Sequence, residues 1–179
     1  MLKLIIPARE IYDEEKNEFL YTKEHVISLE HSLVSVAKWE SKWGKPFLGR
    51  NDKTVAEALD YIKCMTITQN VDDSVYLAID NNAMQKINDY IEAPMTATWF
   101  APDKSPPSRE IVTSELIYYW MIELGIPFEC QKWHLNRLFT LIKVCSIKKN
   151  PPKKMSKKEI LMRNKELNDA RRKARNTKG

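Results

Sequence analysis

Apolar residues recur every three or four positions through residues 32–147, and this helical period constrains the fold more than any other feature of the chain. Ser32 is an expected N-cap. Thr54 and Glu57 form a capping box, in which each side chain binds the other residue's backbone amide. Gly44 is an expected helix stop. The chain holds only four glycines, fewer than the turns of an all-β fold usually need, so the pattern predicts a mainly helical body.

The start and stop signals predict five or six helices. They span about 33–43, 55–65, a short turn through 77, a helix from Asn81 or Asn82 to just before Pro94, and two long helices at 109–124 and 128–147. Val55, Leu59, Ile62 and Met65 are expected on one face of the second of these. A tight turn at Gly125 should join the last two helices as an antiparallel hairpin at the centre of the core. Residues 101–108 are rich in proline and polar residues, and we expect a loop there.

The first 30 residues have strand character instead. Short alternating or β-rich runs occupy residues 2–6, 19–21 and 25–29, and the first should end at Pro7 because proline cannot donate to a ladder. The acidic stretch 13–18 is expected to form a long loop. The predicted fold class is therefore α+β, mainly α: a small N-terminal β-ribbon (1–30), a helical bundle (31–150) and a protruding basic C-terminal helix.

Charge is divided sharply along the chain. Residues 148–179 hold 13 Lys and Arg against three acids, a net charge of +10, and the whole chain nets +5, which leaves −5 for residues 1–147. Ser156 and Glu159 form a second capping box and open a helix with few aliphatic side chains. Such a helix buries little surface alone. We therefore expect a globular body at 1–150 and a detached, partner-dependent basic helix or tail at 151–179.

Basic residues of this tail are the candidate partner-binding residues: Lys153, Lys154, Lys157, Lys158, Arg163, Arg171, Arg172, Lys173 and Arg175. One interpretation is docking on an acidic protein surface, either the chain's own body or a second copy. Another is binding to nucleic acid phosphates, and a third is a solubilising end. The tail has no aromatic residue to stack on bases, so protein docking or a solubilising end is favoured over nucleic acid.

Cys130 and His134 are the best candidates in the sequence for a chemically active site. They are four residues apart on a predicted helix, so both should face one side. A zinc site needs three or four ligands, and Cys145 lies too far along the same helix to complete one. A nucleophilic pair would lack an oxyanion loop and an orienting third residue. We therefore expect no catalytic residue, no metal site and no cofactor, and the chain is not expected to be an enzyme.

Three cysteines without framework spacing argue against a secreted disulfide scaffold and favour a reducing compartment. The N-terminus does not resemble a signal peptide, and no apolar stretch is long enough to span a membrane.

Trp39 and Trp43 are four residues apart and share a helical face. Core packing is the more common role for such a pair. The functional alternative is an aromatic anchor for a protein partner, because tryptophan is enriched at interaction hot spots.

Several stretches together resemble one protein family. They are residues 29–33 and 38–41, 94–98, 113–115 and 117–121, and 126–131 and 133–137, with the ending at 155–158, 167–168 and 170–172. In these stretches the chain is similar to a family of small proteins from tailed bacteriophages, and the likeness spans nearly the whole chain.

The resemblance implies a role in tail assembly and supplies no catalytic residues. The expected function is a non-enzymatic, chaperone-like factor that binds tail tube or tape-measure protein in the host cytoplasm during virion morphogenesis. Self-association is a further possibility. Two alternatives stay open: a nucleic-acid-binding protein that uses the basic tail, and a structural virion component such as a connector or tail completion protein.

Overall fold

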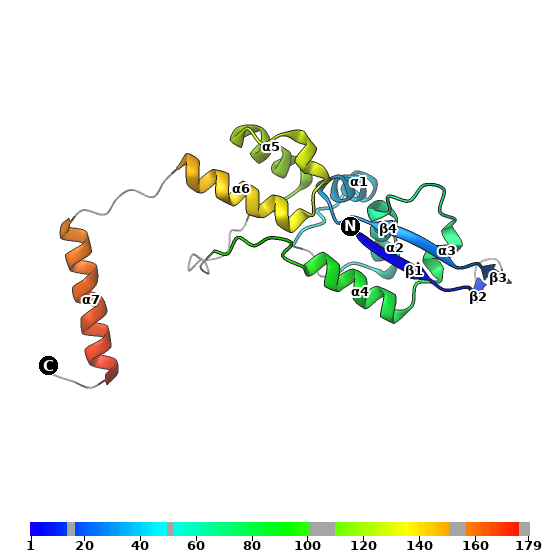
Figure 1. Cartoon of the computed structure of the whole chain (residues 1–179), viewed down its shortest axis with the longest axis horizontal. Helices are drawn as coiled ribbons and strands as arrows, with labels where there is room; N and C mark the ends of the chain where they lie inside the picture. The colour runs from blue at the N-terminus through cyan, green and yellow to red at the C-terminus, as the bar shows by residue number, and fades with distance from the viewer. Residues whose placement is uncertain (14–16, 50–51, 101–109, 151–156, 176–179) are drawn as a thin grey trace. The chain divides into compact units, whose positions relative to one another are not determined.

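The computed structural model describes residues 1–13, 17–49, 52–100, 110–150 and 157–175 (Figure 1). The chain divides into two compact units, Met1–Ser146 and Ile147–Gly179, so the division falls slightly before the predicted one after residue 150. The expected loop at 101–108 and the Ser156 cap lie outside the described residues.

The described elements confirm the predicted mainly helical α+β class. Their order is β1 (Leu2–Ile6), β2 (Arg9–Asp13), β3 (Glu18–Thr22), β4 (His25–Leu29), α1 (Leu33–Trp43), α2 (Val55–Met65), α3 (Asp73–Leu77), α4 (Asn81–Glu92), α5 (Ser114–Leu124), the 3₁₀ turn η1 (Phe128–Lys132), α6 (Leu135–Lys149) and α7 (Lys157–Arg175).

The four strands form one long antiparallel hairpin. β1 pairs with β4 from Leu2 opposite Leu29, and β2 pairs with β3 from Arg9 opposite Thr22. The register is the same in both ladders, so β1 and β2 run on as one strand while β3 and β4 return beside it (Figure 1). The ladder is interrupted at Pro7, which has no N–H to donate. The ribbon was predicted, but β2 was not, because no strand was expected between Pro7 and residue 19.

The hairpin changes its buried face along its length. In the β1–β4 half, Leu4 and Ile27 point into the core. In the β2–β3 half the opposite face is covered, because Ile11 and Leu20 are half-buried and Thr22 is buried where β3 packs against α3. A strongly twisted two-stranded ribbon permits this change. As a result, the side of the hairpin that is buried at Leu4 in β1 is exposed to solvent in the β2–β3 half.

Local capping signals explain where the first helices begin and end. Ser32 caps α1 and shares a capping box with Ser35, and Gly44 ends the helix in the left-handed conformation at φ +62°. The predicted Thr54–Glu57 capping box opens α2, with both of its hydrogen bonds present. These predictions are confirmed. The expected position of Val55 is wrong: it is 78% exposed, because the buried face of α2, which includes Tyr61 and Met65, is turned around the helix away from Val55.

α1 lies at the centre of the core and packs against α2, α5 and η1. The core takes side chains from the hairpin and from most helices of the first unit: Leu4, Ile27, Leu33, Val36, Ile62, Met65, Ile87, Ile117, Met121, Leu135 and Leu138. The predicted α5–α6 hairpin is therefore not the centre, because α5 contacts α1 more extensively than it contacts α6.

Two predicted helix boundaries are wrong for tertiary reasons. α5 begins at Ser114 rather than near residue 109, because the Ser114 amide is held by the Glu40 carboxylate at 2.7 Å. The expected helix over 128–147 is broken at Trp133, whose backbone is extended. A new helix starts at Leu135, whose N–H donates to the His31 carbonyl at 2.7 Å.

Candidate partner-binding site

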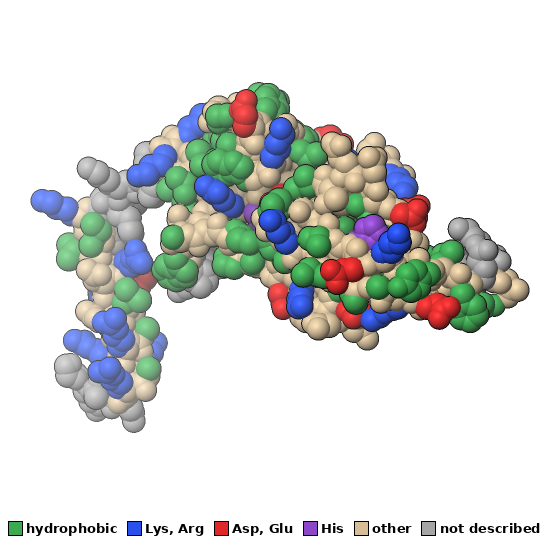
Figure 2. Space-filling model, turned by 45° about the vertical axis from the view of Figure 1, so that its right-hand side comes forward, with side chains coloured by type: hydrophobic (Ala, Val, Ile, Leu, Met, Phe, Trp, Pro, Cys, Tyr) green, Lys and Arg blue, Asp and Glu red, His purple; other side chains and the backbone are tan. Residues whose placement is uncertain are grey.

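α7 is the element that carries most of the predicted site residues. It spans 19 residues, with eight Lys and Arg against three acids, and every side chain of α7 that the structure describes is exposed. Arg172, Lys173 and Arg175 lie in its last turn, where cations interact favourably with the free carbonyl groups. Lys and Arg side chains are spaced along the visible face of this helix (Figure 2).

The cations of α7 do not form one face. Each residue turns the helix by about 100°, so Arg171, Arg172 and Lys173 point in three different directions. Lys157, Arg163 and Arg175 also lie on α7, as does Lys158, whose side chain is not described. Lys153 and Lys154 lie outside the described residues. The arrangement suits attraction to a negatively charged surface in several orientations.

A narrow apolar stripe runs along one side of α7. Ile160, Leu167 and Ala174 are seven residues apart, so they stack on one face, and the two aliphatic side chains are nearly half exposed. Arg163 and Arg171 flank this stripe on the helical wheel. A partner that covers the α7 stripe would therefore meet aliphatic groups with guanidinium groups at their sides.

Trp39 is a core residue and not a partner anchor. It is fully buried, and its indole N–H donates to the Glu57 carbonyl at 2.9 Å. Trp43 stacks on it at 6.0 Å, is half-buried, and donates to an Asp60 carboxylate oxygen at 2.9 Å. Both rings connect α1 to α2, as expected if the pair packs in the core.

Cys130 and His134 do not share a helix as expected. Cys130 lies in η1, and His134 precedes α6. The His134 Nε2–H donates to the Tyr90 carbonyl at 2.9 Å, and its Nδ1 accepts the Asn136 amide at 3.3 Å. Both ring nitrogens are therefore engaged, and burial lowers the pKa of His134. This histidine caps the start of α6.

His31 lies next to His134 in the same buried polar cluster. Their rings meet edge to face at 5.2 Å, and His31 Nδ1 shares a hydrogen bond with the Tyr61 hydroxyl. Burial, with a smaller contribution from His134, lowers the pKa of His31 to about 3. Among the described residues no buried side-chain nitrogen or oxygen lacks a hydrogen-bond partner. The cluster is a satisfied core network that links the β4–α1 junction, α2, α4 and the start of α6.

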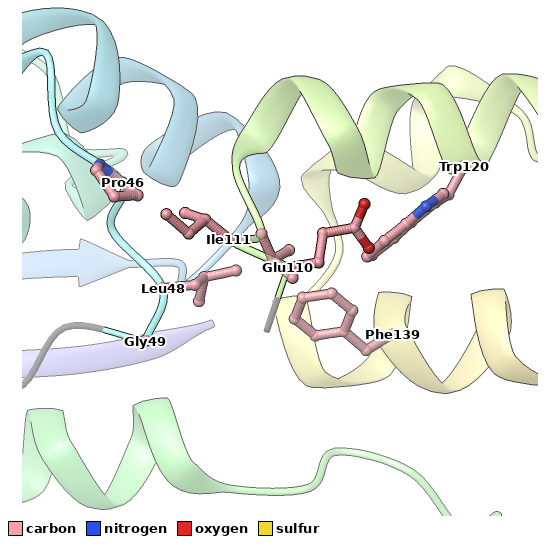
Figure 3. Close-up of a pocket in the computed structure, with 8 residues that line it drawn as sticks. Pro46, Leu48, Gly49, Glu110, Ile111, Trp120 and Phe139 are labelled. Atoms are coloured by element: carbon pink, nitrogen blue, oxygen red, sulfur yellow. The ribbon is translucent and has the colours of Figure 1, made fainter. Parts of the chain in front are cut away.

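An apolar pocket of about 880 Å³ lies in the first unit (Figure 3). Its walls come from the loop after α1, the segment before α5, and one aromatic side chain each from α5 and α6: Pro46, Leu48, Gly49, Glu110, Ile111, Val112, Trp120 and Phe139. Among the described residues of this lining, Glu110 is the single titratable one. The pocket suits an apolar group better than paired acid–base chemistry.

In the part of the chain that the structure describes, no three His, Cys, Asp or Glu residues are placed to hold a metal ion. Within the same residues no helix is both long enough and apolar enough to cross a membrane. Comparisons with protein-family models, with curated proteins and with solved structures give no match for this chain.

Proposed function

We propose that this protein is a non-enzymatic, chaperone-like factor of phage tail assembly, which binds a tail tube or tape-measure protein through α7. The observation that carries the proposal is α7 itself: a 19-residue cationic helix whose described side chains are all exposed. An isolated helix of this length is only marginally stable in water, so a segment of this kind gains most from a partner. The bacteriophage resemblance of the sequence supplies the class of partner.

The chemistry of α7 suits binding that can be reversed. Burial of the exposed halves of Ile160 and Leu167 would contribute roughly 1 kcal/mol each, and part of this is offset by the ordering of the helix. The remaining attraction is electrostatic and is screened within about 10 Å at 0.1 M salt. Such a contact holds an acidic protein and releases it when a stronger subunit contact forms.

The body supports the non-enzymatic part of the proposal. His134 has both ring nitrogens in hydrogen bonds, and His31 is held by Tyr61 inside the core. Histidines held in this way favour a structural role, which supports a protein that works by binding.

Co-expression tests the proposal. The tube protein or the tape-measure protein is expressed with the full chain, with a chain that ends at Asn150, and with a four-charge variant of α7. That variant carries Arg171→Gln, Arg172→Gln, Lys173→Gln and Arg175→Gln. We expect the native chain to keep the tail protein soluble and the two altered chains to lose most of this effect.

A charge-matched control removes four exposed lysines from the body: Lys3→Gln, Lys23→Gln, Lys86→Gln and Lys132→Gln. This control should protect the tail protein as well as the native chain does. If the chain that ends at Asn150 protects equally well, α7 is not the binding element. Mass spectrometry of purified virions separates an assembly factor, which is absent from the particle, from a structural virion component.

Nucleic-acid binding is the second candidate, and the eight cations distributed around α7 favour it. A gel-shift assay with duplex DNA over a range of salt concentrations distinguishes the two. Submicromolar binding with a steep salt dependence would favour nucleic acid, because each phosphate contact releases counterions.

A further inference from the structure

Three aromatic side chains lie exposed together on the β2–β3 half of the hairpin. Tyr12, Phe19 and Tyr21 are 47%, 69% and 73% exposed, and we call them the aromatic face. Tyr12 and Phe19 are directly opposite each other in the ladder, with ring centroids 5.1 Å apart. Tyr21 is two residues beyond Phe19 on the same strand, so it points to the same side. These rings therefore form one continuous surface.

Folding of the hairpin does not explain this surface. The opposite side of β2–β3 carries the half-buried Ile11 and Leu20 and packs against α3. Antiparallel ribbons with one covered side usually place polar residues on the other. Aromatic residues on the solvent side are instead typical of protein interfaces, because their large rings bury much area with few rotatable bonds.

The charge around the aromatic face indicates the sign of its partner. Glu10 is exposed, lies opposite Tyr21 in the ladder and shares the side of Tyr12. In sequence, the stretch 10–18 holds five acids and one lysine, and Glu10 is the acid of this stretch whose side chain the structure describes. A nucleic acid or an anionic membrane would be repelled here. Aromatic rings beside carboxylates are instead a good surface for arginine, which stacks on the ring and pairs with the acid.

This chain carries such a partner in α7. Arg163 and Arg171 flank the α7 stripe, so aliphatic and guanidinium groups are presented together. We propose that the aromatic face of one chain binds α7 of a second copy, so that two chains exchange their basic helices in a dimer. Two chains offer two equal contacts of this kind, and the second forms at a high effective concentration once the first is made.

The inference does not depend on which tail protein the factor serves. In the dimer, α7 is bound by the aromatic face of the second copy until the tail protein is present. The second copy and the tail protein would then compete for the same helix. Failure of the dimer would leave the co-expression result untouched, and failure of co-expression would leave the dimer untouched.

Sedimentation equilibrium of the full chain tests the dimer. We expect the mass of two chains at 50 mM salt and of one chain at 1 M salt, because screening weakens the charged contact. Phe19→Thr with Tyr21→Thr should raise the dimer dissociation constant at least about tenfold, since exposed aromatic anchors carry much of an interface. Arg163→Gln with Arg171→Gln should have the same effect without altering the hairpin.

The matched control is an exposed apolar pair elsewhere on the same ribbon. Ile5 and Val26 face each other across β1 and β4 and are 63% and 53% exposed. Ile5→Thr with Val26→Thr should leave the dissociation constant within about twofold of the native value. Circular dichroism confirms that each variant is folded. A single-chain mass at every concentration and salt, or an equal effect of the control pair, would overturn the proposal.

Crosslinking then places the contact. A carbodiimide joins carboxylates to lysines, and Lys157 is the lysine of α7 nearest the α7 stripe on the helical wheel. A mixture of unlabelled and ¹⁵N-labelled chains should therefore give a Glu10–Lys157 crosslink between a light and a heavy chain. Crosslinks from Glu10 to α7 that join only peptides of one isotope, or crosslinks between chains that never involve the hairpin, would overturn it.

Discussion

Glu40 joins three segments of the body through one buried carboxylate. Its Oε1 accepts the Phe47 amide and its Oε2 accepts the Ser114 amide, both at 2.7 Å. The second contact lies at the start of α5, where free amides and the helix dipole favour a negative charge. One side chain of α1 thus fixes both the loop after α1 and the first residue of α5.

Glu40→Ala is predicted to destabilise the body by about 3 kcal/mol, because two buried amides lose their acceptor at once. Urea unfolding followed by tryptophan fluorescence measures the change. Glu129→Ala, at an exposed position in η1, is the control and should shift stability by less than about 0.5 kcal/mol. A loss below about 1 kcal/mol for Glu40→Ala would mean that water replaces the carboxylate easily.

His31 makes stability depend on pH on the acid side. Its pKa is lowered from 6.5 to about 3, so between these values the unfolded chain binds a proton that the folded chain does not. Stability is therefore fully present above pH 6.5 and falls as the pH drops toward 3, by about 1.4 kcal/mol per pH unit. The lowered pKa of His134 acts in the same direction.

Urea midpoints at pH 7.5, 6.0 and 5.0 check this prediction. They should fall steadily in the native chain. His31→Gln keeps a partner for the Tyr61 hydroxyl but cannot titrate, so its midpoint should be lower at pH 7.5 and should fall less steeply. Equal midpoints at pH 7.5 and 5.0 in the native chain would contradict the assignment of a buried, neutral His31.

Gly125 determines where the helix α5 ends. Gly125 has φ +68°, its amide bonds to the Ile122 carbonyl, and the Ile126 amide bonds to the Met121 carbonyl, which is the Schellman pattern predicted from Gly125 and Ile126. An added Cβ would meet no atom within 4 Å, so only the backbone conformation opposes a side chain.

Gly125→Ala is therefore predicted to destabilise the body by about 1–2 kcal/mol, the energy of a left-handed residue with a Cβ. Gly125→Asn should recover part of this loss, since asparagine tolerates that conformation. Thermal unfolding of the two variants beside the native chain gives the order. An equal loss for both would point to packing instead of backbone conformation.

Elements that depend on neighbours in sequence were predictable, and elements that depend on distant contacts were not. The Ser32 cap, the Thr54–Glu57 box and the Gly125 stop are signals within one turn of their helix. The start of α5 depends on Glu40, far away in sequence, and the break before Leu135 depends on the His31 carbonyl. Neither amino-acid composition nor hydrophobic periodicity predicts either of these contacts.

The candidate site divides in the same way. α7 was predictable because charge and capping are local properties of residues 156–175. The aromatic face was not predicted, because the acidic residues 13–18 indicated a loop and β2 was not recognised. A signal was present, since Phe19 and Tyr21 are two residues apart, as residues on one side of a strand are. The burial of Trp39 depends on contacts between α1 and α2. Helical spacing alone could not decide between a core residue and an exposed anchor for a partner.

On the scale of the molecule, an acidic body and a basic helix are joined in one chain but differ in what stabilises them. The first unit has a core built from the hairpin and several helices. The described side chains of α7 are all exposed, so α7 is stabilised by its helix propensity and by charges within itself. The two units should therefore unfold by different transitions.

Thermal unfolding at 1 M salt, where charged contacts are screened, tests this difference. All five tryptophans lie in the first unit, so their fluorescence reports the body alone, whereas circular dichroism at 222 nm reports the helices of both units. Fluorescence should show one cooperative transition. The dichroism signal should also decline gradually below that transition, as a single helix frays, and the decline should be absent from a chain that ends at Asn150. Coincident transitions by both probes in the full chain would mean that α7 unfolds with the body.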